Sequence, residues 1–153
     1  MFLLGLILAS SVAHGANYKV KRTWASKYST PDVMICKDSN TKKETVEKAV
    51  KFWEAEGFEV GNIVKEKNNE CSDKWERGYI LIGGSSDIDV YENHGITYPF
   101  CANGTEKMVS AYILFDKDLA NNLNLVKHEL GHGLGLGHTY KWGHLMHEYG
   151  GIY

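Results

Sequence analysis

Three histidines and one glutamate lie close together near the end of the sequence, in the segment HELGHGLGLGH at residues 128–138. On a helix, His128 and His132 are four positions apart, so their imidazole rings project from one face and can bind one metal ion together. Glu129 lies on the same turn, where its carboxylate can reach a water molecule on the metal without binding the metal itself. The spacing therefore predicts a metal site with a general base beside it.

A third metal ligand is predicted just after this helix. Gly135 lets the backbone leave the helix through a conformation that other residues resist, and we expect His138 to turn back toward the metal. Three neutral imidazoles favour zinc and leave a fourth position open for water. Gly131 and Gly133 each cost about 1 kcal/mol relative to alanine inside a helix, and we expect the zinc site to offset this cost. The alternative interpretation is a helix whose surface histidines share this spacing by chance.

The same residues resemble a known motif. The segment HELGHGLGLGH, followed by Met146 in GHLMHEYG, is similar to the long zinc-binding motif and Met-turn of the metzincins. The spacing from His138 to Met146 resembles that of the matrixins, the matrix metalloprotease group. The resemblance implies that His128, His132 and His138 bind one catalytic zinc ion, Zn2+. It also implies that Glu129 is the catalytic acid and base, and that Met146 forms an apolar floor under the metal.

The resemblance also implies a fold and a substrate. It is close over residues 125–146, and upstream only the order of the elements is compatible. The implied fold is α+β and zincin-like, with a mixed five-stranded twisted sheet, two long helices and a short lower part after the active-site helix. A protein or peptide substrate would bind in extended form along an edge strand at about residues 109–114, through main-chain hydrogen bonds. The implied activity is that of a zinc metalloendopeptidase.

Several positions depart from the matrixin pattern. The Pro-x-Tyr segment that lines the main specificity pocket of matrixins is replaced after Met146 by the residues HEYG, so the specificity of that pocket is not carried over. The sequence ends at Tyr153, so we expect no C-terminal helix, and we also expect no matrixin-type prodomain. Three residues are candidate ligands for Ca2+, against the simpler interpretation of a solvated loop: Asp87, Asp89 and His94.

Two further histidines lie close to this motif in the sequence, and two other functions are compatible with a zinc site. We interpret His144 and His147 as rim residues of the cleft, because three histidines already complete the ligand set. The chain could instead be a binding protein that keeps zinc for stability without turnover, or a zinc hydrolase acting on a non-peptide amide. Glu129 favours a peptidase over a structural zinc protein, because a purely structural site does not need an acid at that position.

Short apolar and amphipathic segments predict the elements that position the site. The apolar residues from Val46 to Trp53 follow helical spacing, so an amphipathic helix is predicted over residues 41–56 and ends at Gly57. A second helix over residues 121–132 carries the first two histidines. This order of elements predicts a right-handed crossover in a mixed sheet. Strands are predicted at residues 33–36, 58–65, 78–82 and 108–115, with a long surface loop at residues 87–104.

Composition and the N-terminal segment bound the class of protein. The chain has 153 residues, 43% of them hydrophobic, and a formal charge of -2. We therefore expect one globular domain, a monomer, with no electrostatic reason to bind nucleic acid or a membrane surface. The apolar run in residues 1–15 predicts a signal peptide, followed by the catalytic domain at residues 16–153, and hence a secreted protein, or a periplasmic one if the source is bacterial. A membrane anchor is the alternative, but the run is shorter than the roughly 17 residues that span a bilayer.

The three cysteines allow at most one disulfide within the chain, and an exported protein meets conditions where disulfides persist. Cys36 lies inside the apolar run VMIC and is predicted to be a buried strand residue. Cys71 and Cys101 lie in polar, turn-rich segments. We therefore expect a bridge between Cys71 and Cys101, although pairing cannot be deduced from sequence alone.

Overall fold

The computed structural model describes residues 18–66, 71, 76–84 and 94–149. The predicted signal peptide at residues 1–15, together with Asp87 and Asp89, lies outside the described residues. The elements follow one another in this order: β1 (Thr23–Trp24), the 3-10 turn η1 (Ser26–Tyr28), β2 (Asp32–Ile35), α1 (Lys43–Ala55), β3 (Ile63–Lys65), β4 (Tyr79–Ile82), β5 (Gly95–Cys101), β6 (Lys107–Phe115) and α2 (Leu123–Gly133).

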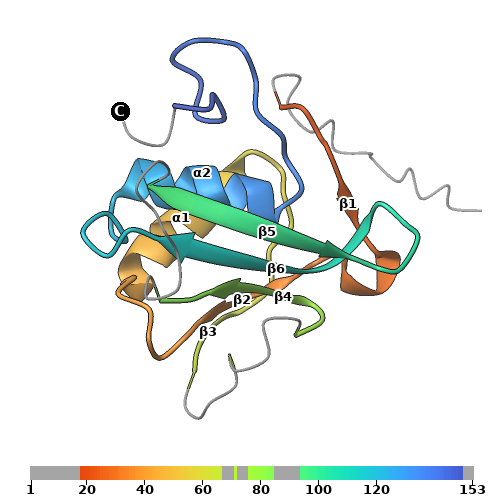
Figure 1. Ribbon diagram of the computed structural model, residues 1–153, viewed down its shortest axis with the longest axis horizontal. Helices are drawn as coiled ribbons and strands as arrows, with labels where there is room; N and C mark the ends of the chain where they lie inside the picture. Colours follow the sequence, from red (N-terminus) through yellow and green to blue (C-terminus); the bar gives the residue numbers. More distant parts are fainter. Residues whose placement is uncertain (1–17, 67–70, 72–75, 85–93, 150–153) are drawn as a thin grey trace, which may run out of the picture.

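A mixed, mostly parallel sheet forms the framework of the molecule (Figure 1). Its strand order is β1-β6-β4-β2-β3, in which each neighbouring pair is parallel, and β5 pairs with β6 in the antiparallel direction. The mixed α/β architecture with two helices agrees with the expectation. Within the described residues the sheet has six strands rather than the five that the resemblance implies, and β1 contributes only two paired residues.

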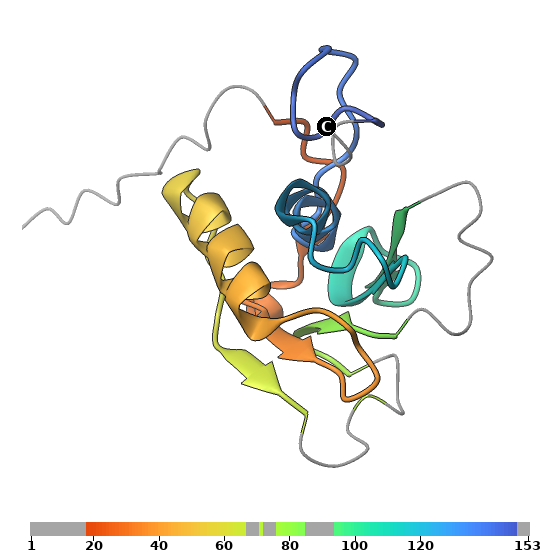
Figure 2. The ribbon, with the colours of Figure 1, turned by 90° about the vertical axis from the view of Figure 1, so that its left-hand side faces the viewer.

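Both helices pack on the same face of the sheet (Figure 2). Because successive strand residues point to opposite faces, alternate residues of β2, β4 and β6 meet the helices. The apolar face of α1 has the predicted helical spacing, and Gly57 ends the helix with a φ of 90°. The helix-facing core contains Val33, Ile35, Ile80, Ile82, Ala111, Ile113 and Phe115 from the sheet, Val46, Ala49, Val50 and Trp53 from α1, and Leu125, Val126 and Leu130 from α2.

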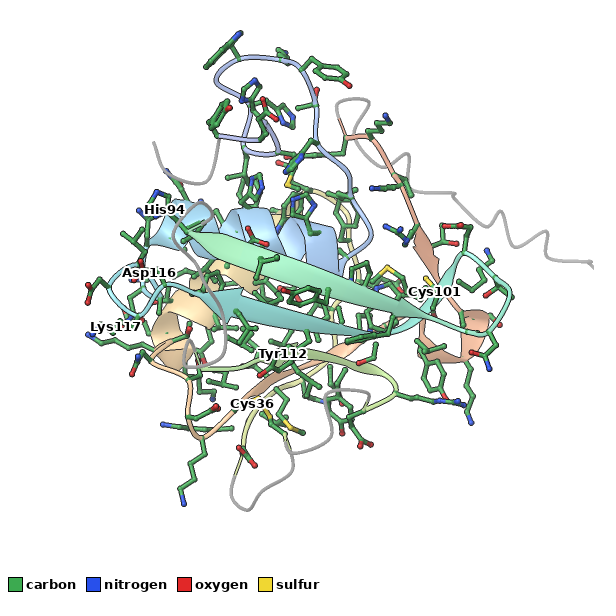
Figure 3. All side chains as sticks on the ribbon, viewed as in Figure 1. Cys36, His94, Cys101, Tyr112, Asp116 and Lys117 are labelled. Carbon is green, nitrogen blue, oxygen red and sulfur yellow. A yellow bond between two sulfur atoms is a disulfide. The ribbon has the colours of Figure 1, made fainter. Side chains whose placement is uncertain are left out.

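The disulfide lies on the opposite face and differs from the expectation. Cys36 bonds to Cys71, with an S–S distance of 2.07 Å, and both pack in the smaller apolar cluster on the face without helices. Cys101 is a free thiol that packs against the helix-facing core at the end of β5 (Figure 3). The predicted Cys71–Cys101 bridge is therefore wrong, because the sheet separates those two sulfur atoms.

Two other sequence-based predictions need correction. The predicted strand at residues 58–65 is confined to Ile63–Lys65, because Phe58 turns into the core, where its ring lies 5.3 Å from that of Trp53. The loop predicted at residues 87–104 contains the seven-residue strand β5. A proline at residue 99 reads as a strand breaker, but an edge strand tolerates it where its missing N–H would face away from the sheet.

The position of the edge strand also differs from the prediction. Ala111 of β6 pairs both with Ile80 of β4 and with Pro99 of β5, so the predicted edge strand at residues 109–114 lies inside the sheet. β5 takes the outer position beside it. Among the described residues, no helix has the length and apolar character needed to cross a membrane.

Candidate metal centre

The three predicted histidines converge at the C-terminal half of α2. The Nε2 atom of His132 lies 3.1 Å from Nε2 of His128 and 3.0 Å from Nε2 of His138. Across the described part of the chain, this is the only group of three or more His, Cys, Asp or Glu residues whose ligand atoms all lie within 4.8 Å of one another. The three side chains can therefore bind one metal ion.

Main-chain carbonyls decide which ring nitrogens face the metal. His128 Nδ1 donates to the carbonyl oxygen of Leu145 at 2.7 Å, and His132 Nδ1 donates to that of Leu136 at 2.8 Å. Since a carbonyl can only accept, each Nδ1 carries the proton and each Nε2 presents a lone pair. Two lone pairs facing each other at about 3 Å repel unless a cation lies among them. The donor set therefore fits a metal ion and would be unfavourable without a cation.

Burial keeps these rings in the neutral form that binds metal. Loss of solvation lowers the pKa of His128, lowers that of His132 from 6.5 to about 4, and lowers that of the more accessible His138. The hydrogen bonds to the two carbonyls oppose this shift at His128 and His132 but do not reverse it. All three rings are therefore neutral at pH 7 and ready to accept a cation.

The turn after α2 brings His138 back to the other two rings. Gly135 has a φ of 98°, a left-handed conformation that glycine adopts without strain. A Cβ atom at this position would also collide with the carbonyl oxygen of Arg22. The glycine predicted to end the helix is therefore required for two independent reasons, its backbone conformation and the close approach of the N-terminal segment.

The N-terminal segment, residues 19–22, holds this turn in place. The N–H groups of Lys21 and Arg22 both donate to the carbonyl oxygen of Gly135 at 2.9 Å, and Gly137 N–H donates to the carbonyl oxygen of Lys19 at 2.8 Å. Since these bonds lie directly before His138, a segment more than 100 residues away in sequence positions the third histidine of the group.

Met146 packs against α2 and explains a glycine inside the helix. Its side chain is buried, and a Cβ atom at Gly131 would lie 2.6 Å from Met146 Sδ and 2.7 Å from Trp53 Cζ2. A Cβ atom at Gly133 would lie 3.1 Å from Ile80 Cγ2. Packing therefore gives a reason for the glycine at 131, because Met146 and Trp53 occupy the space that a side chain would need. The expectation that a zinc site offsets the helix cost of both glycines stays a prediction.

Glu129 lies in a nearly dry environment beside β5. It is 4% exposed, its side chain packs against Gly95, and Thr97 Oγ1 donates to Glu129 Oε2 at 2.6 Å. Burial raises the pKa of Glu129 to about 7, and the hydrogen bond from Thr97 opposes the shift. A carboxyl group with this pKa can accept and release a proton near neutral pH, as a general acid and base must do.

Gly95 and Thr97 are residues that sequence reasoning missed, because it predicts a loop over this region. The available signal was the period-two alternation of Ile96, Tyr98 and Phe100, which is typical of a strand. Pro99 obscured that signal.

The outer edge of β5 runs past this carboxyl group. Asp116 N–H donates to the carbonyl oxygen of His94 at 2.9 Å, and the antiparallel register continues from that pair. Because bonded and non-bonded pairs alternate in an antiparallel ladder, the N–H and C=O groups of Gly95 and Thr97 point away from β6. Pro99 has the same orientation and lacks an N–H. In the part of the chain that the structure describes, no strand pairs with this edge.

A pocket of about 260 Å³ opens next to the histidines. Lys21 and Arg22 of the N-terminal segment line one side of it, and Thr97 and Pro99 of β5 line the other. His132 forms part of its wall. The pocket therefore adjoins both the metal site and the strand edge.

The other candidate histidines do not join the group. His144 Nδ1 accepts a hydrogen bond from Met146 N–H at 3.1 Å, and the ring of His147 is buried and stacked on Trp142 at 4.5 Å. Both belong to the turn around Met146 that follows His138. His94 is exposed at the start of β5 (Figure 3), and its proposed calcium partners are outside the described residues, so the calcium expectation stays a prediction.

Comparisons with known proteins give limited information. No protein-family model matches the chain, and no curated protein matches it. Thirteen chains of solved structures match, among them the crystal structure of metalloproteinase-II from Bacteroides fragilis, which is 15% identical with a TM-score of 0.46. The match covers 88% of this chain and 52% of that chain, so this chain spans about half the length of that metalloproteinase. At this level of similarity the case for function rests on the geometry of the site.

Proposed function

We propose that this chain is a secreted zinc-dependent endopeptidase of the metzincin type, with His128, His132 and His138 as zinc ligands and Glu129 as the general base. The observation that carries the proposal is the convergence of three imidazole Nε2 atoms next to a buried carboxyl group whose pKa is about 7. A purely structural metal site has no need of that carboxyl group.

Zinc fits the donor set because it accepts three imidazole nitrogens and leaves one position open for water or substrate. A zinc ion bound there would supply Lewis-acid chemistry, acidifying water and polarising the scissile carbonyl group. The protein's part is to keep the three rings neutral and aligned, through burial and through the carbonyls of Leu145 and Leu136.

Glu129 would carry the proton through the reaction. It takes a proton from the attacking water and then delivers it to the departing amine, and Thr97 orients the carboxyl group for both steps. Burial excludes bulk water, which would otherwise stabilise the ionised carboxylate and weaken it as a base.

The substrate would be a peptide in extended form on the outer edge of β5. Main-chain groups of Gly95 and Thr97 face that edge and can bond to it, which aligns the peptide with Glu129. The proposed position of the substrate is therefore β5 instead of the strand at residues 109–114. The Cys36–Cys71 disulfide and the predicted signal peptide at residues 1–15 support a secreted or periplasmic location.

The test is cleavage of a fluorogenic peptide library by the zinc-loaded protein, before and after treatment with a zinc chelator. We expect chelator-sensitive cleavage, with one zinc ion per chain. Glu129→Gln should keep the metal and lose roughly 10²- to 10⁴-fold in turnover. Glu47→Gln, the same chemical change on the outer face of α1, should keep turnover. Bound zinc without chelator-sensitive cleavage would contradict the proposal and favour a zinc-stabilised binding protein.

A further inference from the structure

The pocket beside the metal site has a basic wall. Lys21 and Arg22 line it, and their backbone is fixed by the two hydrogen bonds to Gly135. Burial is the main cause of the lowered pKa of His132 and His138, and the positive charge of Lys21 lowers both further. The geometry agrees, because the Lys21 side chain packs over Gly137, the residue before His138, where a Cβ atom would lie 3.3 Å from Lys21 Cβ and 3.6 Å from its Cδ.

The acidic groups around the pocket leave this positive charge largely unneutralised. Glu106 is the only acid within 4.0 Å of Arg22 in the described residues, with 3.7 Å between Nε and Oε2, and the Glu106 side chain is 84% exposed, so the pair is weak. Glu148 acts on His138 and does not line the pocket. Lys107 lies nearby and bonds to Thr23. The local balance of charge is therefore positive.

The apolar residues that line the rest of the pocket strengthen the attraction between its cations and a bound anion. Pro99 and Met108 contribute apolar surface, and the volume of about 260 Å³ corresponds to roughly nine water molecules at about 30 Å³ each. A side chain can fill such a space. An anionic group bound there would interact with the cations in a medium less polar than bulk water, which strengthens the attraction.

The direction of β5 relates the pocket to the cleaved bond. Gly95, at the start of the strand, contacts Glu129, and Pro99, four residues later, lines the pocket. Antiparallel pairing is the more stable arrangement of an added strand. A peptide that pairs with β5 in this direction would place the residues before its scissile bond at the pocket.

We propose that this pocket binds a carboxylate and that the enzyme prefers peptides with Asp or Glu one to three residues before the scissile bond. The inference rests on the proposed peptidase function, and the cleavage test below requires that activity. The second test measures binding alone and does not require it.

The cleavage test uses C-terminally amidated fluorogenic peptides that differ only by Glu or Gln at each of these three positions. We expect kcat/KM to be roughly tenfold higher for Glu at one of them, and the preference to shrink as ionic strength rises. The double variant Lys21→Gln, Arg22→Gln should lose the preference. Lys19→Gln, in the same segment but outside the pocket, should keep it. Equal rates for Glu and Gln peptides in the parent protein would overturn the inference.

The binding test separates this inference from the proposed function. Fluorescence anisotropy would measure the binding of the labelled Glu and Gln peptides to the Glu129→Gln variant, with circular dichroism to confirm that each variant folds. Tighter binding of the Glu peptide that depends on Lys21 and Arg22 would support the pocket even if the parent protein cleaves nothing. Equal binding would overturn the pocket even if cleavage occurs. A preference seen only for peptides with a free C-terminal carboxylate would overturn the assignment to an acidic side chain.

Discussion

At the scale of single residues, burial acts in opposite senses on the acid and the bases of the site. It raises the pKa of Glu129 to about 7 and lowers that of His132 to about 4, because in each case the neutral form is favoured. Without a metal ion, the neutral forms of Glu129 and His132 are thus favoured. Proton binding at these two residues must therefore affect folding in opposite directions.

The pH dependence of unfolding tests this balance in metal-free protein. The pKa of His132 falls from 6.5 to about 4 on folding, so the stability it contributes is full above pH 6.5 and is lost as the pH falls toward 4. Glu129, whose pKa is raised from 4.5 to about 7, contributes stability below pH 4.5 that is lost as the pH rises through 7. In Glu129→Gln only the histidine effect remains. Its free energy of unfolding should fall more steeply between pH 6.5 and 4.5 than that of the parent, by up to about 1.4 kcal/mol per pH unit. Urea titrations in the presence of a chelator would measure this, and equal slopes would refute it.

The two helix glycines offer a second test at the residue scale. Alanine is intrinsically better than glycine in a helix by about 1 kcal/mol. At Gly131, however, the new methyl group would press on Met146 and on the ring of Trp53, which is itself held by a hydrogen bond from Nε1 to the carbonyl oxygen of Lys127. We expect Gly131→Ala to destabilise the protein by about 1 to 3 kcal/mol, as overpacking does. Gly133→Ala, where the nearest contact is 3.1 Å, is the matched control and should change stability by less than about 1 kcal/mol. Chemical denaturation that finds the two variants equally stable would exclude the packing explanation.

At the scale of elements, the site depends on the turns and edges of helices and strands as well as on their regular parts. α2 supplies two histidines and the glutamate, but the turn that ends it leads to the third histidine, and residues 19–22 hold this turn. β5 supplies Thr97 to the glutamate and presents its outer edge. On the opposite face, the Cys36–Cys71 disulfide ties the end of β2 to a residue beyond β3, with α1 and β3 enclosed between the two cysteines.

This bridge gives a prediction at the element scale. Its cysteines are 35 residues apart, and the loss of loop entropy predicts that Cys71→Ser costs about 4 kcal/mol of stability. Cys101→Ser alters a free, partly buried thiol and should cost less than about 1 kcal/mol. Urea denaturation under non-reducing conditions would compare them. Peptide mapping of the parent by mass spectrometry should find Cys36 linked to Cys71, and a Cys71–Cys101 peptide would contradict the structure.

At the scale of the whole molecule, the metal site joins segments that are distant in sequence. Helix α2, strand β5, the N-terminal segment and the turn around Met146 meet there (Figure 1). A metal ion bound to the three histidines would hold α2 to the turn that follows it, and would thereby couple metal binding to folding.

Metal removal tests this coupling. With free zinc at about 100 times its dissociation constant, the folded state should gain about 2.7 kcal/mol, and a chelator should abolish that gain. His138→Ala should bind zinc more weakly and lose most of the zinc-dependent rise in melting temperature. His94→Ala, which removes an exposed histidine outside the metal group, should keep it. A melting temperature that does not respond to zinc in the parent protein would contradict three-histidine ligation.

Local spacing alone predicted a large part of this molecule. The i, i+4 histidines, the adjacent Glu129 and the helix-ending Gly135 are relations within one turn of backbone, so the sequence predicts their positions before any packing is known. The same holds for α1, whose apolar face repeats every turn. The roles assigned to the site residues remain proposals.

Contacts between distant residues were decided only by the tertiary structure. Thr97 meets Glu129 across 32 residues, and the disulfide pairing depends on which face of the sheet each cysteine occupies. The edge position of β5 depends on which strands pair, and the basic pocket depends on where residues 19–22 dock. Residue types constrain such contacts only weakly. The whole core must pack before they form, which is why sequence reasoning predicted the convergence of the three histidines but missed the residues that surround them.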